Sequence, residues 1–274
     1  MNGKYFIFGL GFSGRVIARR LVEAGWEVAG TTRSGEAVEL AGVSVLPYDH
    51  DHPLPPGALD DVTHLLSSVP PDGLGDPVID AVRGRSLHWA GYLSTTGVYG
   101  DHGGGWVDED TPAAPTLERS RRRAEAETAW RAEGAHIFRL AGIYGPGRSA
   151  IDSVRAGTAK RIVKPGQVFS RIHVEDIAGA VLASLARPNR GRIYNLCDDD
   201  AAPPQEVIAH ACTLLGVAPP PEIPWEEARR SLSPMALSFY ADNKRVRNHR
   251  MKAELGVTLA YPSYREGLRA MIAP

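Results

Sequence analysis

The 274-residue sequence lacks most features that mark secreted, membrane-spanning or nucleic-acid-binding proteins. It holds two cysteines, Cys197 and Cys212, which form neither a CxxC pair nor a zinc-binding set. We expect both cysteines to be small buried residues and the protein to reside in a reducing compartment. No apolar run approaches the roughly 20 residues of a membrane helix, and no signal-peptide pattern precedes the first predicted strand. A formal net charge of −1 gives no electrostatic case for nucleic acid or an anionic membrane. We therefore predict a soluble, cytoplasmic protein that binds neither nucleic acid nor a membrane.

Short apolar strands alternate with helical segments through the first half of the chain. Residues 4–9 are apolar and end in glycine, residues 13–24 carry apolar side chains at helical spacing, and residues 26–32 form a second strand pattern. The same alternation predicts strands at 43–46, 63–69, 87–94 and 135–140, and helices at 77–83 and 118–133. It indicates an α/β fold of the Rossmann type, with a doubly wound parallel sheet covered by helices on both faces.

The pattern changes after residue 145, where prolines become frequent and favour loops with short helices. Two regular pieces remain, a helix at 174–185 and a strand at 192–196. We predict a dinucleotide-binding Rossmann domain over residues 1–145, to which the pieces at about 172–197 return. Residues 146–274 then form a smaller, loop-rich and mainly substrate-side region.

The first strand is followed by the glycine-rich turn Gly9-Leu10-Gly11-Phe12-Ser13-Gly14. A GxGxxG pattern alone is weak, but this one joins a strand to a helix, as a pyrophosphate-binding turn requires. Gly9 would permit the tight turn, Gly11 the close approach of the phosphates, and Gly14 the packing of helix against strand. The backbone around Phe12 and Ser13 would then present free N–H groups to a dinucleotide. The alternative is an ordinary glycine turn.

The end of the second predicted strand indicates which dinucleotide is bound. NAD-preferring domains place an acid there for the ribose 2′-hydroxyl, but this chain has Thr31-Thr32-Arg33-Ser34. Arg33, assisted by Ser34 and by the nearby charge of Arg15, would suit a 2′-phosphate. We therefore predict NADP(H) over NAD(H), with Asp49 after the third strand near the adenine. The alternative is that Arg33 is a solvated loop charge.

Several motifs in order resemble the extended and atypical short-chain dehydrogenase/reductases, the NAD(P)-dependent epimerase/dehydratase-like family. The resemblance covers nearly the whole chain and rests on the glycine turn, on residues 93–100 (LSTTGVYG), on 139–148 (RLAGIYGPGR), on 171–178 (RIHVEDIA) and on the Tyr194-Asn195-Leu196 strand. It implies a nicotinamide cofactor, a small-molecule substrate and a homodimer. By position, Thr95 matches the Ser or Thr that bonds the substrate oxygen in the family.

The family's Tyr-x-x-x-Lys pair is missing. Alignment on Pro115 places Arg119 at the tyrosine and Arg123 at the lysine, and residues 115–133 contain neither Tyr nor Lys. Arginine does not release a proton at ordinary pH, so Arg119 does not replace the tyrosine as acid. Arg123 retains the ability to bond the ribose hydroxyls of the cofactor.

Two tyrosines are the replacement acids that sequence suggests. Tyr99 and Tyr144 follow the fifth and sixth predicted strands, at the sheet edge where ligands bind, although both would also serve to shape a pocket. His173 and His102 are weaker candidates, and a packing or loop role is the alternative for each. The cluster His50-Asp51-His52 resembles a metal pair only superficially, and we predict no metal site.

Two functions from different classes remain open at this point. The first is an oxidoreductase or epimerase acting on a small hydroxyl or carbonyl substrate, with Thr95 polarising the oxygen. The second is a non-catalytic protein that senses NADP(H), which the loss of the Tyr and Lys pair favours. An open polar pocket beside the nicotinamide would support the enzyme, and a filled one would support the sensor.

Overall fold

The computed structural model describes residues 3–35 and 40–272, and within them seven parallel strands form one central sheet. Their order is β11-β7-β5-β4-β1-β2-β3, so the sheet grows outward in both directions from β1 and β4. The strands are β1 (Lys4–Phe8), β2 (Glu27–Thr32), β3 (Val43–Pro47), β4 (Val62–Ser67), β5 (Trp89–Thr95), β7 (His136–Leu140) and β11 (Ile193–Leu196). In such open sheets ligands bind at the point where the order reverses, outside the carboxyl ends of the strands.

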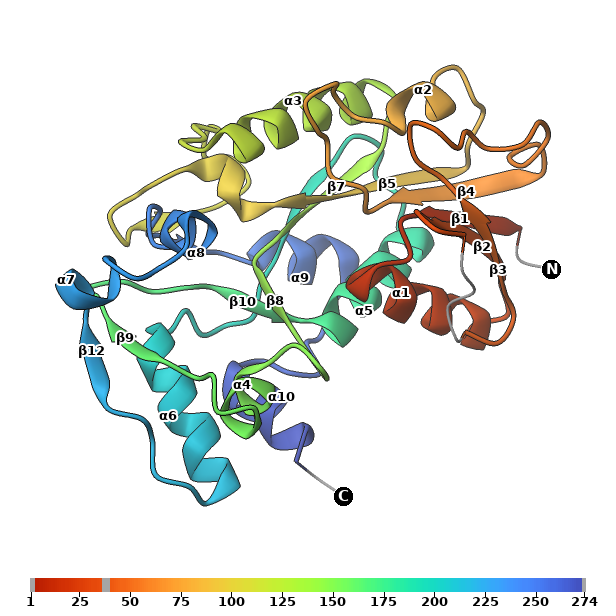
Figure 1. The fold of residues 1–274 in the computed structure, drawn as a ribbon. Helices are drawn as coiled ribbons and strands as arrows, with labels where there is room; N and C mark the ends of the chain where they lie inside the picture. The colour runs from red at the N-terminus through yellow and green to blue at the C-terminus, as the bar shows by residue number, and fades with distance from the viewer. Residues whose placement is uncertain (1–2, 36–39, 273–274) are drawn as a thin grey trace.

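Helices cover both faces of this sheet (Figure 1). One face packs against α1 (Phe12–Glu23), α5 (Val174–Ala186) and α9 (His249–Leu255), and the other against α2 (Ile79–Val82) and α3 (Glu118–Ala132). The alternation of side chains along β1 supplies both cores, because Tyr5 and Ile7 lie in the first and Phe6 and Phe8 in the second. All four side chains are fully buried, which fixes β1 at the centre of the fold.

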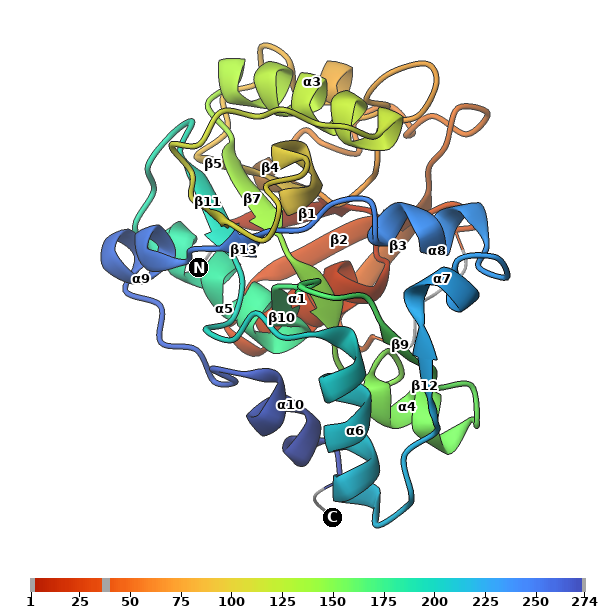
Figure 2. The same ribbon diagram turned by 90° about the vertical axis from the view of Figure 1, so that its left-hand side faces the viewer.

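A second region lies below the sheet edge, around a smaller apolar cluster that includes Tyr144, Ile151 and Leu268. Figure 2 shows the helices at residues 150–155, 204–215 and 264–270 beneath the main sheet. Three short parallel pairs connect it: β8 (Gly142–Tyr144) with β10 (Arg171–His173), β9 (Arg161–Val163) with β12 (Glu222–Pro224), and β13 (Arg245–Val246) with β6 (Trp106–Val107). Its helices are α4 (Ala150–Arg155), α6 (Pro204–Leu215), α7 (Trp225–Ala228), α8 (Pro234–Phe239) and α10 (Tyr264–Ala270).

The fold class predicted from the sequence is confirmed. Each strand expected in the sheet is present within two residues of its predicted start, and the helix expected at 174–185 is α5. Besides the elements at about 172–197 that were expected to return to the main sheet, α9 also packs on it through Met251 and Leu255. No helix in the described ranges has the length and apolar character to cross a membrane.

Candidate functional site

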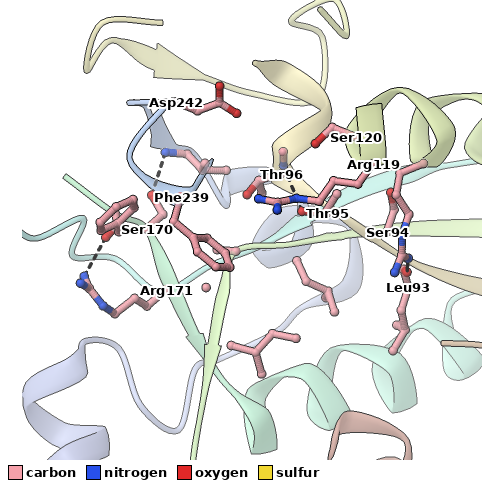
Figure 3. Close-up of a pocket in the computed structure, with 18 of the residues that line it drawn as sticks. Leu93, Ser94, Thr95, Thr96, Arg119, Ser120, Ser170, Arg171, Phe239 and Asp242 are labelled. Atoms are coloured by element: carbon pink, nitrogen blue, oxygen red, sulfur yellow. Dashed lines mark hydrogen bonds between the residues drawn. The ribbon is translucent and has the colours of Figure 1, made fainter. Parts of the chain in front are cut away.

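A cavity of about 740 Å³ opens at the carboxyl ends of β1, β4, β5 and β7. The glycine turn after β1 lines one part of it, and Thr95 with the short 3-10 helix η1 (Thr96–Tyr99) lines another. Segment 238–246 from the second region closes the opposite side. Figure 3 shows Thr95, Thr96 and the guanidinium of Arg119 near one another in this pocket, with Phe239 and Arg171 on the other side. The cavity is therefore shared between the sheet and the second region.

The three glycines of the turn have three different surroundings. Gly9 has φ +88°, and a Cβ there would lie 2.6 Å from Ser68 Oγ. A Cβ on Gly14 would lie 2.3 Å from the Gly9 carbonyl oxygen, so the start of α1 packs directly on the turn. A Cβ on Gly11 would meet no atom within 4 Å, and Gly11 lines the cavity. Only Gly11 therefore faces open space that a ligand can approach.

The first turn of α1 suits an anion. Gly11 is its N-cap and provides no side-chain cap, and no acidic residue lies in the first turn. The free N–H groups and the positive end of the helix dipole therefore remain available to phosphate oxygens beside Phe12 and Ser13, which also line the cavity. These residues fit the pyrophosphate of a dinucleotide.

The residues predicted for the far end of the dinucleotide lie outside the cavity lining. Arg33 and Ser34 follow β2 and are exposed, and the Arg15 Nε donates to the Leu10 carbonyl oxygen at 3.0 Å. Asp49 lies after β3, where its Oδ1 accepts bonds from the backbone N–H and ring Nδ1 of His52, both at 2.8 Å. The Asp49 carboxylate thus accepts hydrogen bonds from its own loop.

Thr95 ends β5 with its hydroxyl at the cavity, where Oγ1 accepts a bond from the Gly97 N–H at 3.1 Å. Its neighbour Ser94 donates to Glu127 Oε1 at 2.6 Å, and Glu127 binds the Arg139 guanidinium at 2.7 Å. The pair of Glu127 and Arg139 is buried and joins α3 to β7 behind the site. This network fixes the end of β5, and through it the position of Thr95.

The two tyrosine candidates do not present their hydroxyls to the cavity. Tyr99 is fully buried and does not line it; its hydroxyl donates to Asn195 Oδ1 at 2.7 Å, and burial raises its pKa to about 12. The Tyr144 ring lines the cavity, but its hydroxyl donates to the Ser263 carbonyl oxygen at 3.3 Å and burial raises its pKa. Neither hydroxyl enters the proposed chemistry below.

The two arginines at the positions of the missing motif both line the cavity. Arg119 Nη1 donates to Ser238 Oγ at 2.7 Å, and its guanidinium lies 5.1 Å from the centre of the Phe239 ring. Through these two contacts Arg119 binds α8 at the cavity. Arg123 Nη1 donates to the Leu93 carbonyl oxygen at 2.5 Å. Arg123 therefore reaches from α3 to the end of β5, at the sheet side of the cavity.

The histidines have structural partners. The Nδ1 of His173 accepts the Glu175 N–H at 3.2 Å as the cap of α5, and burial lowers its pKa to about 4. His102 bonds the Tyr99 carbonyl oxygen at 3.1 Å, and His50 pairs with Asp72 at 2.7 Å on the surface. Across residues 3–35 and 40–272, no group of three or more His, Cys, Asp or Glu side chains is placed to hold a metal ion.

The structure adds cavity residues that the sequence analysis missed. They come from the second region and comprise three cationic residues, one acid and two aromatic residues: Arg148, Arg171, Lys244, Asp242, Phe169 and Phe239. Burial lowers the pKa of Lys244 and of Arg171. Arg148 and Arg171 fall inside the segments that carried the family resemblance, whereas no motif surrounds the other four residues.

Comparisons with known proteins were made for sequence and for fold. No family model matches the chain. It is 31% identical to Protein YeeZ of Escherichia coli K12, over 94% of this chain and 96% of YeeZ. It is 27% identical to a 3-diazoavenalumate denitrifying reductase of Streptomyces, over 60% of this chain and 55% of the reductase.

Solved structures match the whole fold. A conserved protein of unknown function from Silicibacter pomeroyi has a TM-score of 0.91 and 50% identity, with 98% of both chains covered. A candidate NAD-dependent epimerase/dehydratase from Methylobacillus flagellatus has a TM-score of 0.76 and 27% identity, covering 99% of this chain and 98% of that one. The chain belongs to the epimerase/dehydratase-like short-chain dehydrogenase/reductase family. The resemblance drawn from its motifs is thereby confirmed.

Proposed function

We propose that this short-chain dehydrogenase/reductase is an NADP(H)-dependent oxidoreductase or epimerase acting on a small hydroxyl or carbonyl compound. The observation that carries the proposal is the continuous cavity that Gly11 and Thr95 both line. A Cβ on Gly11 would meet no atom within 4 Å, which supports a pyrophosphate there, and the position of Thr95 in the same lining supports a bond from its hydroxyl to a substrate oxygen. The reductase and the candidate epimerase among its relatives support the same class of reaction.

The residues of the chain have separable roles in this proposal. The N–H groups around Gly11, Phe12 and Ser13 hold the phosphates, and Arg123 of α3, which lines the cavity beside β5, bonds a ribose hydroxyl. A bound nicotinamide cofactor supplies the capacity to accept or donate a hydride. Thr95 orients the substrate oxygen, and the Glu127–Arg139 pair keeps the end of β5 fixed.

The preference for the 2′-phosphorylated cofactor rests on Arg33. Arg33 is exposed one residue beyond the end of β2, where a domain specific for NAD would present an acid. A guanidinium binds phosphate through paired N–H donors, and Ser34 adds a hydroxyl. NADP(H) is therefore the cofactor we propose.

The non-catalytic sensor is the second candidate function. It requires the space beside the cofactor to be filled. The cavity of about 740 Å³ instead continues from the glycine turn to polar side chains of the second region, including Ser170 and Asp242. This space favours an enzyme over a sensor.

Cofactor titration with an Arg33 variant tests the proposal. We expect wild-type protein to bind NADPH at least about tenfold more tightly than NADH, because a charge-assisted phosphate contact contributes on the order of 1.5–3 kcal/mol. Arg33→Ala should remove most of this difference and leave NADH affinity unchanged, as measured by calorimetry. Arg155→Ala, an exposed arginine at the end of α4, is the matched control. Equal affinities for NADPH and NADH in the wild type would contradict the preference, and no binding of either would contradict the function.

A further inference from the structure

The proposed reaction needs a proton donor, and the cavity contains few groups that can act as one. Four arginines line it, and arginine does not release its proton at ordinary pH. The Tyr144 hydroxyl points to the Ser263 carbonyl, and Asp242 Oδ1 accepts a bond from Thr116 Oγ1 at 2.7 Å. Within the described cavity lining, Lys244 carries the one amine.

Lys244 reaches the cavity from the segment between α8 and β13, far along the chain from the position of the missing motif lysine. Its side chain is only 10% exposed. The Nζ donates to the Gly100 carbonyl oxygen at 2.7 Å, directly after η1, and lies 3.5 Å from Asp242 Oδ2. The amine is thus hydrogen-bonded to the end of the turn that follows Thr95.

These contacts leave part of the amine available. An ammonium group has three N–H donors, and the described partners Gly100 and Asp242 account for two of them. The third is free to meet a ligand on the cavity side, where Lys244 is part of the lining. A buried amine paired with Asp242 therefore lies between the Gly100 carbonyl oxygen and the cavity.

We propose that Lys244 is the catalytic acid and base at the substrate oxygen, in the role that the tyrosine has in the wider family. This inference rests on the proposed function. In the reductive direction the carbonyl carbon receives a hydride from the reduced nicotinamide. The carbonyl oxygen takes a proton from the Lys244 ammonium, so one N–H bond breaks and one O–H bond forms. The neutral amine regains a proton from solvent, and oxidation runs through the same steps in reverse.

The charges around Lys244 suit this role. Burial lowers the pKa of the amine, and the carboxylates of Asp242 and, more weakly, Asp101 oppose that effect. Arg119 from α3 also faces the cavity, and Lys164 from the loop after β9 binds the Tyr240 carbonyl nearby. An amine whose pKa lies below the usual value releases and regains a proton near neutral pH more readily than a surface lysine.

Chemical labelling tests the state of the amine without requiring a substrate. Trinitrobenzenesulfonate reacts with neutral amines, and its attachment is followed by peptide mass spectrometry across pH 6 to 10. We expect Lys244 to react at lower pH than the exposed Lys160, and saturating NADPH to slow Lys244 at least about tenfold while leaving Lys160 unchanged. The proposal would be overturned if Lys244 and Lys160 were labelled with the same pH dependence and NADPH did not slow the labelling of Lys244.

Turnover of a panel of aldehydes, followed by NADPH absorbance, tests the catalytic role. We expect Lys244→Met and Lys244→Arg each to lower kcat on the order of 100-fold, with the Kd for NADPH unchanged and Lys160→Met as the control. Wild-type kcat in Lys244→Met would overturn the proposal and leave the proposed function intact, whereas absence of NADPH binding would overturn the function itself. If no aldehyde is reduced, the labelling of Lys244 remains the test of the proposal, with the outcomes stated above.

Discussion

At the scale of single residues, Arg119 shows how a substitution in a motif changes the use of a position. A tyrosine there would direct a hydroxyl into the site, but the arginine donates to Ser238 and contacts the Phe239 ring of α8. None of the residues of α8 is buried, so the helix depends on such contacts to remain over the cavity. Arg119 therefore connects α3 to α8, and its guanidinium does not supply a proton at ordinary pH.

Asp198 gives a prediction at the same scale. This buried residue follows β11, and its Oδ2 has no hydrogen-bond partner within the described structure. Burial raises its pKa to about 8. The folded state therefore retains a proton that the unfolded state loses near pH 4. Stability from this group is fully present below pH 4 and is lost as the pH rises through about 8.

We expect Asp198→Asn to reduce the fall in unfolding free energy between pH 5 and pH 8, because the amide does not ionise. The wild-type slope from this one group approaches about 1.4 kcal/mol per pH unit, measured by urea unfolding at each pH. The exposed Asp80→Asn is the control and should leave the wild-type slope unchanged. Equal slopes for Asp198→Asn and the wild type would show that this carboxyl ionises normally.

At the scale of elements, the buried pair of Glu127 and Arg139 connects α3 to β7. Both side chains are about 95% buried, and Glu127 also accepts the Ser94 hydroxyl of β5. The Arg139 guanidinium lies 4.7 Å from the centre of the Tyr99 ring. The pair therefore connects three elements that meet behind Thr95, and the contacts of each partner depend on the other.

We expect Glu127→Ala to lower the unfolding free energy by about 3–5 kcal/mol, because it leaves a buried guanidinium without its carboxylate. Arg121→Ala breaks an exposed pair with Glu118 on the same helix and should cost less than about 1 kcal/mol. Urea unfolding at neutral pH measures both. A loss of under 1 kcal/mol for Glu127→Ala would show that water or another group replaces the contact.

At the scale of the whole molecule, the sheet was predictable because its signals are local. Each strand is a short apolar run, and the periodicity within α1 and α5 appears in consecutive residues. The glycine turn at the cavity was predictable for the same reason, since Gly9, Gly11 and Gly14 lie within six residues of one another. Local patterns of this kind do not depend on how distant parts of the chain meet.

The part of the cavity formed by the second region could not be predicted in this way. Lys244 and Asp242 reach the cavity only because the chain returns from α8 to pair β13 with β6. No spacing in the sequence relates them to Thr95. Tyr99 and Tyr144 show the converse, since both follow sheet strands as expected but their hydroxyls bond Asn195 and the Ser263 carbonyl. The direction of a side chain beyond the end of a sheet strand is set by tertiary contacts.

The central claim is that the open space at Gly11 holds the pyrophosphate of a dinucleotide, and titration of Gly11→Val with NADPH tests it most directly. We expect binding to weaken at least about 100-fold, because the side chain would fill the space that the phosphates need, while the melting temperature stays near that of the wild type. Gly179→Ala, a helical glycine whose added Cβ also meets no atom within 4 Å, is the control and should bind normally. Unchanged NADPH affinity in Gly11→Val would contradict the account.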